Sequence, residues 1–160
     1  MTSQILTTQE ASELTQTAWV RFLRAHAALT RELGARLEAE HGLTMSDFDV
    51  LIQLYHAPDH AMKRIDIARQ VLLTASGITR LLDGLERCGL VAKRSCETDA
   101  RVSYAVLTDE GLGKVEAARQ SHQADVDELF GAALSVTERE QLAELLARLP
   151  LAPTSKACSE

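Results

Sequence analysis

The chain has 160 residues, of which 46% are hydrophobic, 25% are charged and only 4% are aromatic, and its formal net charge is −6. This length predicts one compact domain or a small two-lobed chain, and the aliphatic composition favours a helical core. No apolar run is long enough to cross a membrane, and the first residues lack the basic and apolar blocks of a signal peptide. We therefore expect a cytoplasmic protein with no membrane partner.

A long amphipathic helix is predicted for the N-terminal part of the chain. Thr7 and Glu10 have the spacing of a capping box, apolar residues follow at intervals of three and four, and Gly42 suits a left-handed C-cap. A helix of about thirty residues is roughly 45 Å long, which a small domain cannot bury by itself. Part of this helix is therefore expected to pack against another chain.

Three shorter helices are predicted next. The second begins after Thr44, which has the spacing of an N-cap, and ends at Pro58. A connector with one brief strand follows, and the third helix covers residues 64–71. The fourth helix has Thr74 as its N-cap and Gly89 as its C-cap, and its apolar residues recur at helical spacing.

The apolar period changes from 3.6 to 2 after the fourth helix. This change predicts two strands, at residues 90–95 and 102–107, which form a hairpin. A fifth helix is expected to begin at Thr108. The sixth begins at the capping box of Ser135 and ends at Pro150.

This order of elements predicts a mainly α fold with a small β-hairpin wing, an α+β arrangement. Residues 43–108 would form a winged helix-turn-helix lobe that binds DNA. Residues 1–42 and 109–150 would converge from both ends of the chain into a helical dimerisation lobe. Residues 151–160 are expected to be a flexible tail.

The charges are unevenly distributed along the chain. Residues 62–104 contain eight Lys and Arg against five Asp and Glu, so this segment has a net charge of +3 and the remainder −9. The field at a contact face governs its attraction for phosphate, so an acidic chain with one basic module is compatible with DNA binding.

The fourth helix and the hairpin carry the residues expected to bind DNA. Small, hydroxyl-bearing and cationic residues lie opposite the apolar side of the helix, and such a face fits a major groove: Thr74, Ser76, Gly77, Thr79 and Arg80. Cations beside it are expected to reach phosphates or the minor groove: Arg64, Lys93, Arg94 and Arg101.

These residues resemble the MarR family of bacterial transcriptional regulators. The resemblance spans about seventy residues and is carried by the spacing of several short motifs. They are Leu43-Thr44-x-x-x-Phe48-x-Val50-Leu51, Asp66-Ile67-Ala68, Thr79-Arg80-Leu81-Leu82-x-x-Leu85-Glu86-x-x-Gly89-Leu90-Val91, Asp99-x-Arg101 and Leu107-Thr108-x-x-Gly111.

The resemblance implies a homodimer that binds double-stranded DNA at a pseudo-palindromic operator. One recognition helix and one wing of each subunit would contact the duplex. The residue matching Arg101 would reach the minor groove, and the residue matching Asp99 would stabilise the wing by ion pairing. Many relatives have a cation between these two positions, whereas this chain has Ala100, so its wing is one charge poorer.

The resemblance also implies a small-molecule site where the two lobes meet. Trp19, Phe22 and His26 share one side of the first helix and form either lobe core or one wall of a pocket, with Phe48 and Leu51 opposite. Such a wall suits an aromatic or phenolic effector. The sequence thus predicts a transcriptional regulator, a repressor that this effector releases from DNA.

Two alternatives remain open, and several chemistries are not indicated. The cysteines, Cys88, Cys96 and Cys158, lack metal spacing and are interpreted as reduced thiols, but a redox-responsive regulator acting through Cys88 or Cys96 is the first alternative. A winged-helix protein-interaction module is the second. His56 and His60 have metal-ligand spacing that Pro58 interrupts. We expect no metal, no cofactor and no enzymatic activity.

Overall fold

The computed structural model describes residues 7–71, 75–95 and 102–149, and its elements follow the predicted order. The mainly α fold with a small sheet is confirmed. The elements are α1 (Thr8–His41), α2 (Met45–His56), the 3-10 turn η1 (Pro58–His60), β1 (Ala61–Lys63), α3 (Arg64–Gln70), α4 (Ala75–Arg87), β2 (Val91–Ser95), β3 (Ser103–Leu107), α5 (Asp109–Leu129), the 3-10 turn η2 (Gly131–Ala133) and α6 (Val136–Leu146).

The helix ends follow from local capping interactions. Thr7, Thr44 and Ser135 each accept a hydrogen bond from the backbone N–H three residues on, and the acidic residue there accepts one from the cap's N–H. Gly42 closes α1 in the left-handed conformation with φ 64°. These predicted caps are confirmed. α6 ends at Leu146, before the proline expected to stop it, because i→i+3 hydrogen bonds tighten its last turn.

The wing is a three-stranded antiparallel sheet with the order β1-β3-β2. β2 and β3 form the predicted hairpin, in which Arg94 pairs with Tyr104. The brief strand expected in the connector is β1, and it pairs with the other edge of β3, with Lys63 also opposite Tyr104. This pairing ties the segment before α3 to the wing.

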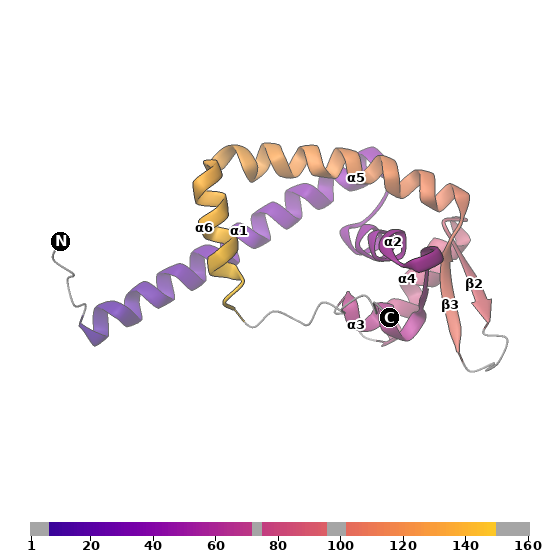
Figure 1. Ribbon diagram of the computed structural model, residues 1–160, viewed down its shortest axis with the longest axis horizontal. Helices are drawn as coiled ribbons and strands as arrows, with labels where there is room; N and C mark the ends of the chain where they lie inside the picture. The colour runs from indigo at the N-terminus through magenta and orange to yellow at the C-terminus, as the bar shows by residue number, and fades with distance from the viewer. Residues whose placement is uncertain (1–6, 72–74, 96–101, 150–160) are drawn as a thin grey trace.

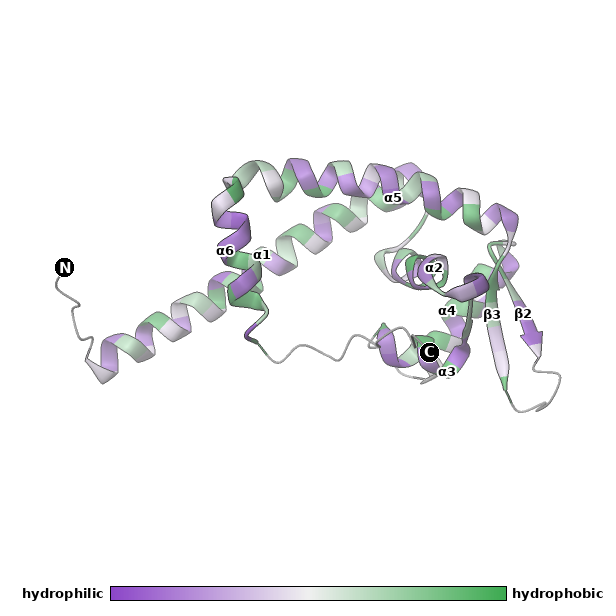
Figure 2. Ribbon diagram, viewed as in Figure 1, coloured by the Kyte–Doolittle hydropathy of each residue, from purple (hydrophilic) through white to green (hydrophobic). Residues whose placement is uncertain are grey.

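α1 and α5 run side by side, with α2–α4 and the sheet at one end (Figure 1). The hydrophobic core lies at that end, where Val50, Leu51, Leu54, Leu82 and Val115 have no exposed surface. Residues 8–28 of α1 are all exposed, although apolar side chains recur along them (Figure 2). The long helix predicted to extend beyond its own core is therefore confirmed.

Candidate nucleic-acid interface

α4 has one face in the core and the other in solvent. Ile78, Leu82 and Leu85 recur at spacings of four and three and are at most 4% exposed. Thr79 and Arg80 lie between them in sequence and are exposed on the other side. Burial of the apolar stripe fixes the rotation of the helix about its axis, so the same residues always point outward. An outward face of this size can enter a major groove.

The wing presents cations beside this helix. Lys93 and Arg94 lie on β2, and both are exposed. The guanidinium carbon of Arg94 lies 5.6 Å from the centre of the Tyr104 ring on β3. This cation–π contact restrains the Arg94 side chain on the surface of the sheet while its nitrogens stay in water. Both cations therefore lie on the solvent-exposed surface of the wing.

The structure describes some of the expected contact residues and not others. Gly77, Thr79, Arg80, Lys93 and Arg94 lie on α4 and β2, close to one another along the chain. Ser76 belongs to α4, but its side chain is not among those described. The remaining expected residues lie outside the described residues: Thr74, Asp99 and Arg101.

Arg64 lies at the start of α3, and its guanidinium faces α4. Its Nη2 donates to Asp83 Oδ1 at 3.1 Å, and its Nη1 donates to Glu86 Oε1 at 3.0 Å. The sequence predicts that Arg64 reaches phosphates or the minor groove. In the structure its guanidinium pairs with these two acids, and Arg80 has no ion pair with any described residue.

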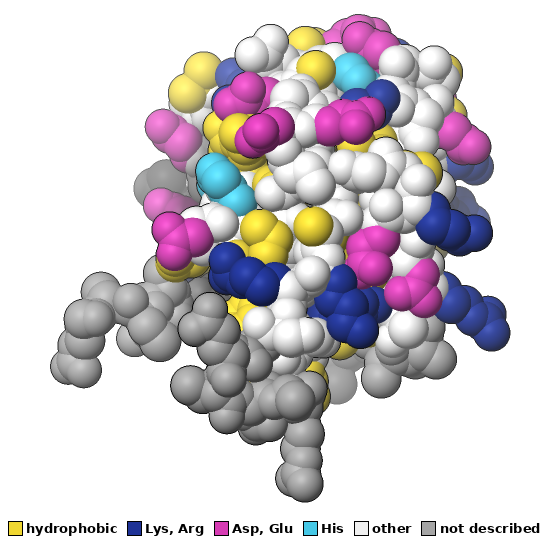
Figure 3. All heavy atoms as spheres, turned by 90° about the vertical axis from the view of Figure 1, so that its right-hand side faces the viewer, with side chains coloured by type: hydrophobic (Ala, Val, Ile, Leu, Met, Phe, Trp, Pro, Cys, Tyr) yellow, Lys and Arg dark blue, Asp and Glu magenta, His cyan; other side chains and the backbone are white. Residues whose placement is uncertain are grey.

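The charge distribution seen from the wing end agrees with the sequence. Lys and Arg side chains gather in the lower half of this face, over the helix-turn-helix and the wing, and Asp and Glu are more frequent above them (Figure 3). The acidic remainder includes Asp125 and Glu128 of α5, which bind Arg36 of α1 at 2.7 and 3.1 Å. That pairing lowers the pKa of Glu128 and joins the two long helices.

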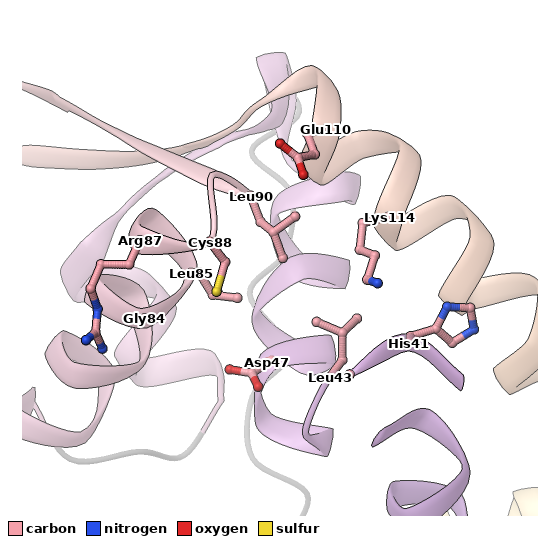
Figure 4. Close-up of a pocket in the computed structure, with 11 residues that line it drawn as sticks. His41, Leu43, Asp47, Gly84, Leu85, Arg87, Cys88, Leu90, Glu110 and Lys114 are labelled. Carbon is pink, nitrogen blue, oxygen red and sulfur yellow. The ribbon is translucent and has the colours of Figure 1, made fainter. Parts of the chain in front are cut away.

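A cavity of about 640 Å³ opens where the C-terminal end of α4 meets the start of α5. Buried leucines form its floor: Leu43, Leu85 and Leu90. Lys114 and the exposed thiol of Cys88 point toward the open space (Figure 4). No local sequence pattern indicates this cavity, because its walls come from four elements that meet only in the folded chain.

A second hollow of about 250 Å³ lies between α2 and α5. The rings of Phe48 and His122 lie 4.8 Å apart there, and His122 Nδ1 is buried without a hydrogen-bond partner in the described structure. Burial lowers the pKa of His122 and raises that of Asp49, although Asp125 and Gln53 respectively oppose these shifts. Both shifts disfavour charge, so this hollow suits an uncharged polar group.

The residues expected to line the effector site are divided between two places. Phe48 lines the second hollow, and Leu51 is fully buried in the hydrophobic core. Trp19, Phe22 and His26 stack along the exposed part of α1, with ring centres 6.2 and 6.4 Å apart. Within one chain, the N-terminal part of α1 extends away from α2 (Figure 1).

The lowered pKa of His122 predicts a pH dependence of folding. The unfolded chain takes up a proton near the ordinary pKa of 6.5, whereas the folded chain resists it until lower pH. Stability should therefore fall as pH decreases from 7.5 to 5.5, and less steeply in His122→Leu than in the wild type. Urea unfolding at a series of pH values measures this, and equal slopes would refute it.

These features define a winged-helix DNA-binding protein: a small helix-turn-helix with a β wing, an exposed helix face and adjacent cations. Residues 41–102 match the model of the MarR family. The chain is 32% identical over 128 residues to the HTH-type transcriptional regulator MhqR of Bacillus subtilis, covering 80% of this chain and 86% of that protein. The chain belongs to the MarR family of DNA-binding transcriptional regulators.

Solved structures have the same architecture. AbsC, a MarR family regulator from Streptomyces coelicolor, is 29% identical with a TM-score of 0.77, covering 90% of this chain and 93% of that one. Sco3205 from the same organism, solved in complex with DNA, is 23% identical with a TM-score of 0.78, covering 91% and 88%. At this identity the second likeness shows the fold alone.

No helix in the described part of the chain is both long and apolar enough to span a membrane. Over the same residues, no three His, Cys, Asp or Glu side chains gather into a group that could hold a metal ion. His60, one of the two histidines at metal-ligand spacing, has its Nδ1 2.9 Å from the carbonyl oxygen of Tyr55.

Proposed function

We propose that the protein is a repressor that binds a pseudo-palindromic operator as a homodimer. The observation that carries this proposal is α4, whose buried apolar stripe turns Thr79 and Arg80 outward beside the cations of β2. Two such helices, related by a twofold axis, would enter successive major grooves about one helical turn apart. A repressor acts when this binding blocks transcription of the adjacent gene.

The contacts divide by chemistry. Ser76, Gly77, Thr79 and Arg80 would meet base edges, where hydroxyl and guanidinium groups discriminate between base pairs. Other residues would contact phosphates or the minor groove, or would hold the wing by ion pairing: Thr74, Lys93, Arg94, Arg101 and Asp99. Ala100 leaves the wing without one further cation, so fewer counterions are released on binding than with a basic residue there.

The homodimer is supported by apolar side chains that the single chain leaves in water. On α1 they include Leu14 and Trp19, which are 59% and 57% exposed, and on α6 Val136 and Leu145, at 62% and 54%. Apolar surface gathered on two helices from opposite ends of the chain is typical of a protein interface. Both helices belong to the dimerisation lobe proposed for residues 1–42 and 109–150.

An aromatic or phenolic effector would bind between the lobes. We place it in the hollow that Phe48 and His122 line, where burial shifts the pKa values of His122 and Asp49 in the directions that disfavour charge. Trp19, Phe22 and His26 would form the other wall from α1 of a second copy. Such a ligand lowers operator affinity only by binding better to the conformation that does not fit DNA.

Cys88 gives a specific reason to test the redox alternative. Its thiol is exposed at a cavity beside the C-terminal end of α4. If a thiol switch operates there, peroxide should release DNA from a Cys96→Ser, Cys158→Ser protein. The same treatment should spare a protein in which Cys88 is also replaced by serine. Equal release from both would exclude Cys88 as the switch.

Selection of DNA from a library of native genomic fragments tests the proposed function. A sequence-specific regulator should enrich a few intergenic fragments that contain an inverted repeat. Footprinting on the best fragment should then protect two half-sites one helical turn apart. No enrichment over random DNA would overturn the proposal and would favour a winged-helix protein-interaction module.

A further inference from the structure

Arg64 bridges the two helices of the helix-turn-helix through both terminal nitrogens of its guanidinium. Its partners, Asp83 and Glu86, are three residues apart on α4 and therefore lie on one side of that helix, one turn apart. The Arg64 side chain is only 16% exposed, against 55% for Asp83 and 26% for Glu86. The planar guanidinium fork suits two carboxylates in a way that a single ammonium does not.

α3 is a short helix with few buried side chains. It is seven residues long, and Ile67 is its one buried side chain, whereas Ile65 is 61% exposed. Ala68 and Val71 are partly buried against the same hydrophobic core. A helix this short gains little stability of its own and takes its orientation from tertiary contacts. The paired contacts of Arg64 add a directional restraint to these apolar contacts, because hydrogen bonds depend on direction and apolar packing depends on it much less.

Arg69 shows what an ordinary surface pair on the same helix looks like. It contacts Asp66 of its own helix at 3.4 Å, and its side chain is 75% exposed. An exposed pair within one helix restrains no second element and contributes little to stability. Arg69 thus provides a matched control, with the same residue type on the same helix but no ion pair with a described residue of α4.

We propose that Arg64 is a positioning residue that sets the orientation of the recognition helix α4, and not a direct contact to DNA. This inference rests on the proposed function, in which α4 reads base edges. Arg64 also neutralises two carboxylates on the helix that approaches the phosphates. Without it, Asp83 and Glu86 would stay charged and unpaired there, and α4 would lose a restraint on its orientation toward α3.

The test compares operator binding with binding to random DNA of equal length. The operator is the duplex that the wild-type protein selects. We expect Arg64→Met to lower the ratio of the two affinities by roughly tenfold, and Arg69→Met to leave that ratio close to the wild-type value. The salt dependence of operator binding should be unchanged in Arg64→Met. Loss of a phosphate contact would instead lower that slope by about one.

A variant that lacks both acids distinguishes a positioning role of Arg64 from a phosphate contact, because the two roles predict different changes in DNA affinity. If Arg64 positions α4, Asp83→Asn with Glu86→Gln should lower the operator-to-random ratio, and adding Arg64→Met should lower it little further. If Arg64 contacts phosphate, removing the two acids frees it, so the ratio should hold while both affinities rise. This second result would overturn the inference.

Two further measurements distinguish a loss of folding from a loss of DNA discrimination. Arg64→Lys retains the charge but cannot span both carboxylates, so its ratio should lie between those of the wild type and Arg64→Met. Each variant is compared at a temperature well below its own unfolding midpoint. A wild-type protein that prefers no duplex would refute the proposed function. If the wild type discriminates and Arg64→Met discriminates equally, only the positioning inference is refuted.

Discussion

Gly111→Ala should destabilise the protein by about 2–4 kcal/mol. A Cβ at this position would lie 1.9 Å from the carbonyl oxygen of Leu90 and 2.9 Å from its carbonyl carbon. Backbone atoms cannot rotate away as a side chain can, so either α5 or the loop before β2 must move. The unfolding midpoint should fall by roughly 5–15 °C.

Gly113→Ala is the matched control on the same helix. Nothing lies within 4 Å of a Cβ there, and alanine favours a helix over glycine by about 0.5–1 kcal/mol. That variant should therefore be slightly more stable than the wild type. Thermal and urea unfolding of both variants measure the contrast, and similar stabilities for the two would contradict the close packing at Gly111.

The contacts around Gly111 explain the motif that ends the MarR resemblance. The Thr108 hydroxyl donates to the Gly89 carbonyl oxygen at 2.6 Å and accepts from the Gly111 N–H at 3.0 Å. The Thr108 N–H donates to the Leu90 carbonyl oxygen at 3.2 Å. One threonine thus caps α5 and ties it to the loop that follows α4. The glycine is required because the same carbonyl lies against the first turn of α5.

The features predicted well from sequence are those that depend on near neighbours. Capping boxes involve residues three apart, so Thr7 and Thr44 could be identified from spacing alone. The same holds for the apolar stripe of α4 and for the switch to strand periodicity after it. Each signal is local, and each of these elements begins or ends close to the expected residue.

The partners of charged side chains could not be predicted in this way. Periodicity shows that Arg64 and Arg80 leave the apolar face, but it does not show what they meet. Arg64 is 19 and 22 residues from its two partners, and their approach depends on the angle between α3 and α4. Sequence spacing indicates only which residues of one helix can meet, such as those at i and i+3, so it does not reveal a contact between α3 and α4.

The turn after α2 shows a further limit. Asp59 and His60 both have positive φ, 53° and 51°, which non-glycine residues seldom adopt. A hydrogen-bond contact between the His60 ring and the Tyr55 carbonyl, and stacking on the Tyr55 ring, support this conformation. Pro58 indicated that α2 must stop, as it does at His56. It did not indicate the path that the chain takes afterwards.

Arg80→Ala should abolish much of the discrimination between operator and random DNA, because Arg80 is an exposed cation of α4 next to Thr79. Bidentate arginine contacts to guanine contribute about 1–3 kcal/mol of discrimination, so operator affinity should fall roughly 5–150-fold. Affinity for random duplexes should change far less. Fluorescence anisotropy with the selected operator and a scrambled duplex, at several salt concentrations, measures both quantities.

Lys93→Ala is the counterpart that removes a cation from the wing. A phosphate contact carries no sequence information, so this variant should weaken both duplexes alike and lower the salt slope by about one. Arg80→Ala should instead change the ratio of the two affinities more than the slope. If Arg80→Ala lowers the affinity for both duplexes equally, Arg80 contacts the phosphate backbone and not the bases. The assignment of α4 to the major groove would then depend on Ser76 and Thr79, whose hydroxyls can discriminate between bases without charge.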